Sequence, residues 1–168
     1  MLAIALNNYY NNKDDTQRQG GYTYMIVKLA REQGGVVPLY ATPKSAGCDV
    51  YSNAGYMLYP GETQIIHTGI YIEIPEGYEA QIRPRSGLAA KHGVTVLNAP
   101  GTIDSDYRGE IMVILHNFGK NIFSIKPQER IAQIVFAPVC QAQFSITERE
   151  NLTQTRRQCG GLGSTGNK

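Results

Sequence analysis

Residues 84–89 read Pro-Arg-Ser-Gly-Leu-Ala, a pattern that can bind an anion at the start of a short helix. The proline is expected to end a strand, and a helix of one or two turns is predicted over residues 87–93. Arg85 and Ser86 then present a guanidinium and a hydroxyl beside exposed backbone amides, which suits a phosphate group. A serine-capped helix with a surface arginine is the alternative that this segment alone leaves open.

Residues 98–110 contain two carboxylates close to a turn. A Pro-Gly pair favours reversal of the chain, so the segment is predicted to form a hairpin whose backbone edge is open to a planar ligand. Asp104 and Asp106 lie two positions apart and would share one side of an extended chain, where paired carboxylates can act as a general base or bind a metal. A solvated turn in which Asp106 pairs with Arg108 is the alternative.

The Gly-rich tail, residues 156–166, offers backbone amides, hydroxyls and arginine side chains. Its GxGxxG pattern is not a dinucleotide fingerprint, because that motif needs a strand before it and a helix after it. Asn167 also stands where a Walker loop would have lysine. A segment that can wrap a polyphosphate remains, with Arg157 adding positive charge. The alternative is a flexible tail that binds no ligand.

Two further segments place a polar residue in an apolar context: Asp49 within Ala-Gly-Cys-Asp-Val, and Gln133 within Glu-Arg-Ile-Ala-Gln. Such residues are expected to be anchored rather than randomly exposed. The three histidines lack metal-ligand spacing and the three cysteines form no CxxC pair, so neither a zinc site nor a disulfide framework is predicted. Cys48 and Cys140 lie in apolar runs and are predicted to be buried packing residues.

The elements that must position these residues are short strands. β-branched residues alternate with polar ones between Gly, Pro and Asn, a pattern typical of a sandwich or barrel. Strands are predicted at residues 64–74, 78–82, 94–97, 111–115, 122–125 and 130–139. With a single short helix, these strands predict an all-β domain.

Composition narrows the possible partners. The chain has 168 residues, close to the size of one domain, a net charge of +2 and only 18% charged residues. This weak charge gives no reason to expect binding to nucleic acid or to an anionic membrane, and no stretch has the length and apolarity of a membrane helix. The cysteine usage and the absence of a signal-peptide pattern predict a soluble cytoplasmic protein.

Three regions are predicted along the chain. Residues 1–24 show no regular period after the first six and are expected to form a flexible N-terminal extension. Residues 25–150 would form the folded domain, and residues 151–168 a C-terminal Gly-rich arm. A short strand formed by residues 1–6 is the alternative for the N-terminus.

Taken in order, these segments resemble the five motifs of the homotrimeric dUTPase family. The matching residues are 46–50, 84–89, 98–110, 129–133 and 157–166. The resemblance implies a distorted jelly-roll β-sandwich of the β-clip type, and a homotrimer in which the exchanged C-terminal arm of one subunit closes over a neighbouring active site. It also implies Mg²⁺-dependent hydrolysis of dUTP to dUMP and pyrophosphate, which keeps uracil out of DNA and supplies dUMP for thymidylate synthesis.

The resemblance also implies roles for individual residues. Asp104 would be the catalytic residue that activates the water attacking the α-phosphorus, and Asp49 would hold the magnesium ion through a water. Tyr107 would pack beneath the deoxyribose and leave no room for a ribose 2′-hydroxyl. The uracil-side residues would be Asn98, Thr102, Ile103 and Met112, and the phosphate-side and arm residues would be Arg85, Ser86, Gly87, Gln133, Arg157, Leu162, Gly163, Ser164 and Thr165.

Leu162 departs from the family pattern, in which most members have a phenylalanine that stacks on the uracil. Leucine can cover the base but cannot stack on it, a loss of about 0.5–1.5 kcal/mol. We therefore expect weaker closure of the arm with intact chemistry.

Two other functions are weighed against hydrolysis of dUTP. A dCTP deaminase resembles this family in fold and trimer, but would need a different acid/base constellation after the turn. A non-catalytic dUTPase-like binding module would be expected to lack the water-activating carboxylate or the tail arginine. Both Asp104 and Arg157 are present.

Overall fold

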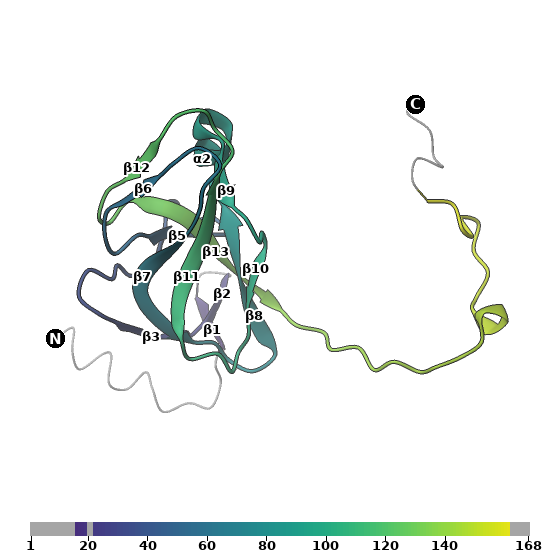
Figure 1. Cartoon of the computed structure of the whole chain (residues 1–168). Coiled ribbons are helices and arrows are strands. Elements are labelled where there is room, and N and C mark those ends of the chain that lie inside the picture. Colours follow the sequence, from purple (N-terminus) through teal and green to yellow (C-terminus); the bar gives the residue numbers. More distant parts are fainter. Residues whose placement is uncertain (1–15, 20–21, 162–168) are drawn as a thin grey trace.

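The computed structural model describes residues 16–19 and 22–161 (Figure 1). Short strands dominate this part of the chain, and α2 is the one α-helix within it. The elements are β1 (Thr16–Gln19), β2 (Tyr22–Met25), β3 (Lys28–Arg31), β4 (Leu39–Tyr40), β5 (Cys48–Tyr51), β6 (Tyr56–Leu58), β7 (Thr63–Glu73), β8 (Tyr78–Pro84), α2 (Ser86–His92), β9 (Val94–Val96), β10 (Gly101–Ile103), β11 (Glu110–Asn117), β12 (Phe123–Ile125), β13 (Arg130–Pro138) and the 3-10 turn η1 (Arg149–Asn151).

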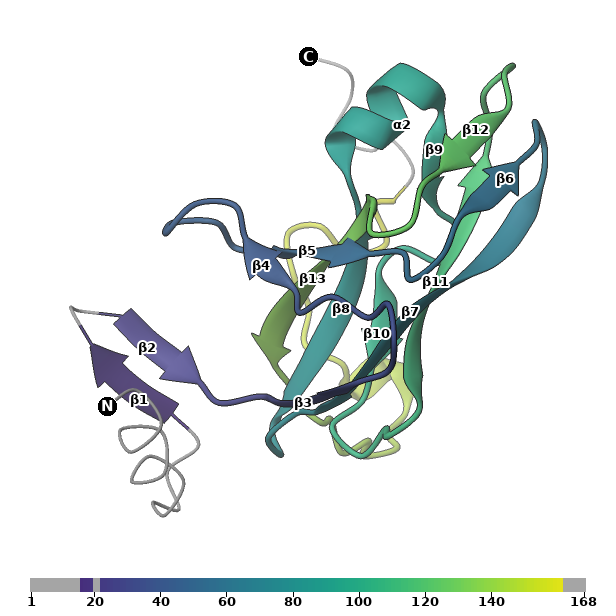
Figure 2. The same ribbon diagram turned by 90° about the vertical axis from the view of Figure 1, so that its left-hand side faces the viewer.

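Two antiparallel sheets build the domain. One has the order β10-β8-β13-β5-β4 and the other the order β3-β7-β11-β9, with the small pairs β12-β6 and β1-β2 beside them. Strands that are distant in sequence therefore lie next to each other, as Figure 2 shows for β5, β8 and β13. This arrangement confirms the predicted all-β jelly-roll class with one short helix.

The core lies between the two sheets because alternate residues of each strand point inward. Along β11, Ile111, Val113 and Leu115 are buried while their neighbours are more exposed. They join a single apolar cluster with residues of the other sheet, among them Ile82 and Ile134. This shared core fixes the two sheets relative to each other, and so fixes the loops that leave them.

Helix α2 is short because both of its ends are determined locally. Pro84 ends β8, and Arg85 takes the N-cap position with extended backbone angles and no side-chain capping bond. Gly93 ends the helix with a φ of 68°, and a Cβ at this position would press on the backbone of Gly119. Glycine is therefore required at this turn. Ser86 is the first helical residue rather than the cap, so the serine-capped alternative is wrong.

The chain leaves the domain after β13 as an extended arm. Figure 1 shows residues 139–161 running away from the sheets. Phe144 and Ile146 are 95% and 100% exposed, and Cys140 is exposed as well, so the prediction that Cys140 is a buried packing residue is wrong. Cys48 is buried, as predicted. No helix in the described ranges is long and apolar enough to cross a membrane.

Strands β1 and β2 pair as an antiparallel hairpin within the region predicted to be an N-terminal extension. The sequence shows no regular period there, so this pairing was not anticipated. The rest of that extension, residues 1–15 and 20–21, lies outside the described residues.

Candidate active site

Asp49 is the centre of a polar cluster built by three segments that are far apart in the sequence. Its carboxylate is buried, and Arg85 Nε lies 3.3 Å from Oδ1 while Arg130 Nη1 lies 3.2 Å from Oδ2. Asp49 also pairs with Gln133 across the β5–β13 ladder. The sheet order therefore brings together three of the five motif segments: two predicted to bind phosphate, and the one in which Asp49 is predicted to hold the magnesium ion through a water.

The guanidinium of Arg85 is held in a fixed orientation. Besides its ion pair with Asp49, its Nη1 donates a hydrogen bond to the backbone carbonyl of Arg130 at 2.9 Å. In the described part of the chain, Nη2 has no hydrogen-bond partner. A positioned guanidinium with one free edge can bind a phosphate oxygen with little loss of side-chain entropy.

The remaining residues that are predicted to contact phosphate lie around this cluster. Gly47 packs against Gln133, because a Cβ on Gly47 would lie 3.4 Å from the Cβ and 3.5 Å from Oε1 of Gln133. Ser86 and Gly87 are exposed at the start of α2, and a Cβ on Gly87 would meet no atom. The backbone at Gly87 is therefore open to a ligand.

Cys48 lies next to Asp49 but is not a reactive group. Burial raises the pKa of the Cys48 thiol, and the neighbouring Asp49 charge raises it further. Burial, with a hydrogen bond to Cys48, also raises the pKa of Tyr40 to about 12. Both side chains therefore stay protonated at neutral pH, and Cys48 packs in the core.

Asp104 and Tyr107 lie on a tight turn that follows β10. The amide of Tyr107 donates to the carbonyl of Asp104 at 3.2 Å, and the carboxylate of Asp104 is exposed. Arg108 donates to the backbone carbonyls of Ser105 and Tyr107, at 2.6 and 2.9 Å. Because Arg108 is committed to these carbonyls and forms no ion pair with Asp106, the acidic-turn alternative is wrong in this detail.

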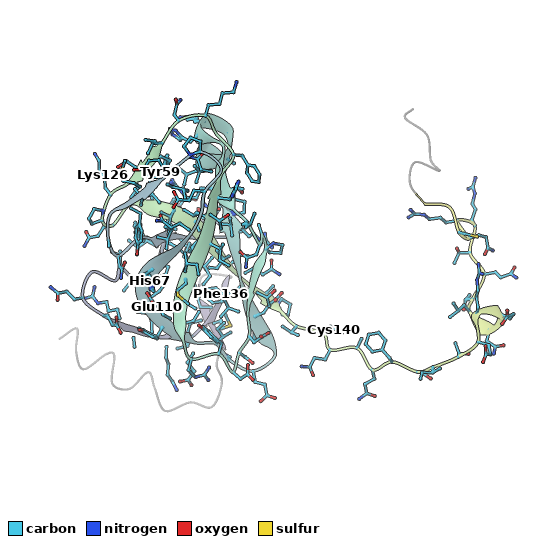
Figure 3. All side chains as sticks on the ribbon, in the orientation of Figure 1. Tyr59, His67, Glu110, Lys126, Phe136 and Cys140 are labelled. Atoms are coloured by element: carbon cyan, nitrogen blue, oxygen red, sulfur yellow. The ribbon has the colours of Figure 1, made fainter. Side chains whose placement is uncertain are left out.

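Glu110 closes this turn at the start of β11. Its Oε2 lies 2.7 Å from His67 Nδ1, and its Oε1 accepts hydrogen bonds from the amides of Thr68 and Gly69. Figure 3 shows His67 and Glu110 side by side. Burial alone would raise the pKa of Glu110, but the hydrogen bonds from His67 and Gly69 outweigh it and lower the pKa below its usual range.

The residues predicted to read a planar base lie on two neighbouring strands. Thr102 and Ile103 are in β10, and Met112 is in β11, where its side chain is 41% exposed. Strand β10 pairs with β8 and not with β11, so the predicted simple hairpin is wrong. In the described pairings, β10 has a strand partner on one side only, and β9 pairs only with the second half of β11, so the first half of β11 has no strand partner on that side.

Asn98 and Gly101 lie at the entrance to that open edge. A Cβ on Gly101 would stand 3.1 Å from Nδ2 of Asn98, so the amide side chain lies against the backbone of β10. Backbone donors and acceptors together with one amide can recognise the hydrogen-bonding edge of a base.

A groove of about 890 Å³ opens beside Asp104. It lies between the turn at residues 73–79, the turn containing Asp104, and the start of the arm at Val139. Neither Arg85 nor Gln133 lines it. The groove therefore adjoins the proposed water-activating carboxylate without including the phosphate-side residues.

The two clusters lie at opposite ends of β8 within one chain. Ile103 pairs with Ala80, which places Asp104 beside Glu79, whereas Arg85 follows the last residue of the strand. Six residues of extended chain therefore separate the two, which is about 20 Å at about 3.3 Å per residue. Asp104 of one chain cannot act on a phosphate bound by Arg85 of the same chain.

The arm contributes one described residue of the predicted site. Nε of Arg157 donates to the carbonyl of Gly160 at 2.8 Å, and its side chain is exposed. The other arm residues predicted to bind substrate, Leu162, Gly163, Ser164 and Thr165, lie outside the described residues.

A sequence model of the dUTPase family matches residues 34–166. The chain belongs to the dUTPase family. The match covers all five predicted motifs and confirms the family resemblance. The polar cluster around Asp49 and the turn with Asp104 therefore lie in segments that the family model covers.

Named relatives in the dUTPase family are similar over nearly their whole length. Deoxyuridine 5′-triphosphate nucleotidohydrolase of Chlamydia pneumoniae is 56% identical over 144 residues, covering 84% of this chain and 99% of that protein. The enzyme of the same name from Nautilia profundicola is 57% identical over 141 residues, covering 84% and 96%.

Solved dUTPase structures share the fold. The dUTPase of Staphylococcus bacteriophage 80alpha, solved with dUpNHpp, superposes with a TM-score of 0.78 at 23% identity, covering 84% of this chain and 98% of that chain. A phage phi11 dUTPase with a structural Mg(II) ion gives 0.69 at 20% identity, covering 74% and 97%.

Sequence reasoning missed two residues of the site. Arg130 completes the Asp49 cluster, and Glu110 anchors the turn that carries Tyr107. Both were within recognised segments, but a charged residue beside a strand gives no sequence signal of its partner. The pairing of β5 with β13 and of β7 with β11 was needed to reveal them.

Proposed function

We propose that this protein hydrolyses dUTP to dUMP and pyrophosphate. The observation that carries the proposal is the meeting of Asp49, Arg85 and Gln133 in a chain of the dUTPase family, which makes a positioned phosphate site next to exposed backbone amides. In this role the protein would keep uracil out of DNA and supply dUMP for thymidylate synthesis.

Phosphate binding falls to Arg85, Ser86, Gly87 and Gln133. The free Nη2 edge of Arg85 and the open backbone at Gly87 support this assignment. Because Asp49 and the carbonyl of Arg130 already hold the guanidinium, little side-chain entropy is lost when it binds the triphosphate. The site is therefore organised before substrate arrives.

Nucleoside selection falls to the open edge between β10 and β11. Asn98 and backbone groups near Thr102, Ile103 and Met112 would bond the uracil edge, and buried polar groups reject an analogue that leaves them unpaired. Tyr107 would lie beneath the deoxyribose, where a ribose hydroxyl would clash. The exposed ring of Tyr107, held by its hydroxyl, supports this role.

Asp104 would orient and deprotonate the attacking water. Its carboxylate is exposed on a turn with a hydrogen-bonded backbone, so it can reach a water while staying fixed itself. In-line attack on the α-phosphorus then depends on holding the triphosphate still. Arg157 and the arm residues Leu162, Gly163, Ser164 and Thr165 would close over the nucleotide and exclude bulk water.

The donor set fits a magnesium ion that is carried by the substrate. In the described residues no group of three His, Cys, Asp or Glu side chains could cage a metal, and both oxygens of Asp49 already face guanidinium groups. Mg²⁺ is usually bound through phosphates and waters, so Asp49 would hold it through a water. When bound, the ion would neutralise charge on the phosphates.

We further propose that the active site is shared between chains of a homotrimer. The separation of about 20 Å between Asp104 and Arg85 in one chain supports this, because the α- and γ-phosphorus atoms of one nucleotide are much closer together. The extended arm, with Phe144 and Ile146 fully exposed, supports exchange of arms between chains. The extended segment that begins at residue 139 would carry the closing arm, residues 151–168, to a neighbouring chain.

One assay separates the proposal from its alternatives. The protein is incubated with dUTP, dCTP, UTP or dTTP and Mg²⁺, and both pyrophosphate and ammonia are followed. Hydrolysis of dUTP alone is expected. Ammonia from dCTP would identify a deaminase, and nucleotide binding without any product would identify a binding module.

A second assay tests the shared site. Asp104→Asn and Arg85→Ala variants should each be inactive, but co-expressed with different tags they should regain activity in mixed trimers, where one interface carries both intact residues. Mixed trimers without activity would contradict a site built from two chains.

A further inference from the structure

An irregularity in the pairing of β7 with β11 leaves two backbone amides facing Glu110. Met112 pairs with His67, yet Glu110 pairs four residues further along β7, so β7 bulges here. Gly69 has a φ of 66° within the bulge, and the amides of Thr68 and Gly69 donate to Oε1 of Glu110 at 3.1 and 2.8 Å. The Glu110 carboxylate therefore accepts hydrogen bonds from two part-buried backbone amides that the β7–β11 ladder leaves unpaired.

The same residue holds Tyr107 through its backbone. The hydroxyl of Tyr107 donates to the carbonyl of Glu110 at 3.0 Å. Gly109 lies directly against the ring, since a Cβ there would overlap Tyr107. The Tyr107 side chain is still 41% exposed, so burial alone does not fix it. Any shift of the Glu110 backbone would therefore move the ring.

We propose that Glu110 is a positioning residue for sugar selection: its carboxylate, clamped to the β7 bulge, sets the place of the Tyr107 ring and so the preference for deoxyribose over ribose nucleotides. This inference rests on the proposed hydrolysis of dUTP and on Tyr107 lying beneath the sugar. In this proposal Glu110 acts through Tyr107 and not by its own contact with the sugar or the phosphates.

Two substitutions separate the reach of the side chain from its charge. Glu110→Asp keeps the charge but withdraws the carboxylate by one methylene, so it cannot span to the Thr68 and Gly69 amides without moving the backbone. Glu110→Gln keeps the length, and its Oε1 can accept both amides while its amino group donates to Nδ1 of neutral His67. The Asp variant should therefore displace Tyr107, and the Gln variant should not.

The matched control is Glu62→Asp. The Glu62 carboxylate also accepts a backbone amide, from Tyr59 at 2.7 Å, but in the turn before β7 and without a link to Tyr107. The Glu62→Asp substitution shortens this side chain by one methylene, as Glu110→Asp does at position 110. Circular dichroism and light scattering would confirm that each variant folds and assembles like the wild type.

The readout is the ratio of kcat/KM for dUTP to kcat/KM for UTP. A general loss of structure lowers both values together, whereas displacement of the ring changes their ratio. Glu110→Asp should lower the ratio by about tenfold, the worth of one hydrogen bond to a charged group. Glu110→Gln and Glu62→Asp should keep it within about threefold.

An unchanged ratio in a folded Glu110→Asp variant overturns the positioning role, and so does an equal fall in the Gln variant or in the Glu62 control. If Glu110→Asp does not fold, the Tyr107→Phe variant provides the test. It removes the hydroxyl that donates to the carbonyl of Glu110, and it must lower the ratio of kcat/KM values. A wild-type protein that releases no pyrophosphate from dUTP refutes the proposed function instead.

Discussion

Asp49→Asn tests whether the buried carboxylate organises the phosphate site. The substitution keeps the shape of the side chain but leaves the guanidinium of Arg85, which is 24% exposed, without its counter-charge. Leaving a charged donor in such a position without its partner costs about 1–3 kcal/mol. The pair with Arg130 is half exposed and adds about 0.2–1 kcal/mol. Because asparagine keeps one acceptor, we expect a loss of about 2–3 kcal/mol.

Thermal unfolding at a fixed protein concentration measures this loss. For a domain of this size the midpoint should fall by about 4–12 °C. The control is Glu73→Gln, which removes an exposed ion pair to Lys28 with a 2.8 Å contact and should shift the midpoint much less. Equal midpoints for the two variants would refute the argument that Asp49 is a buried anchor.

The same variant has a kinetic consequence. Without Asp49 the Arg85 side chain can leave its position, so binding of the triphosphate must order it again. We expect KM for dUTP to rise about tenfold, with a smaller change in kcat. A KM equal to that of the wild type would show that Arg85 needs no anchor.

Three further predictions concern the core, acid stability and the arm. Leu115→Ala, at a fully buried position, should cost about 2–5 kcal/mol in chemical denaturation, and a loss below about 1 kcal/mol would contradict the shared core. The pKa of Glu110 is lower in the folded protein than the usual value of 4.5. The ionised carboxylate therefore stabilises the folded state above pH 4.5, and this stabilisation is lost as the pH falls through the lowered pKa. The unfolding midpoint of the wild type should therefore fall on acidification below about pH 4.5 more steeply than that of Glu110→Gln, and parallel curves would contradict this. Leu162→Phe should lower KM for dUTP about two- to tenfold with kcat unchanged, because a phenylalanine ring can stack on the uracil. An unchanged KM would contradict this contribution of stacking.

The long strands of the fold could be predicted from the sequence. The alternation of β7, β11 and β13 is sustained over many residues and gave boundaries within two residues of those observed. Strands β1 to β6, each two to four residues long, were not predicted, whereas β9 and β12 were predicted although they are equally short. Strand β10 was predicted only as part of a hairpin over residues 98–110, since Pro100 and Gly101 are strong turn residues, and its pairing with β8 depends on tertiary contact.

The site could be predicted as a set of segments but not as a geometry. The residue type of Arg85 indicated phosphate binding, and Asp49 and Gln133 were predicted to be anchored polar residues, yet only the order of strands shows that the three meet. The distance between Arg85 and Asp104 also follows from the pairing register and from no local pattern. Partners of charged residues, such as Arg130 for Asp49, depend on contacts between distant segments and have no signature in the sequence.

Hydrolysis of dUTP in water labelled with heavy oxygen tests the central claim most directly. If an Asp104-activated water attacks the α-phosphorus, the label must appear in dUMP and not in pyrophosphate, and Asp104→Asn must abolish the turnover while nucleotide binding persists. Label in the pyrophosphate, or release of both products at the wild-type rate by Asp104→Asn, would contradict the account.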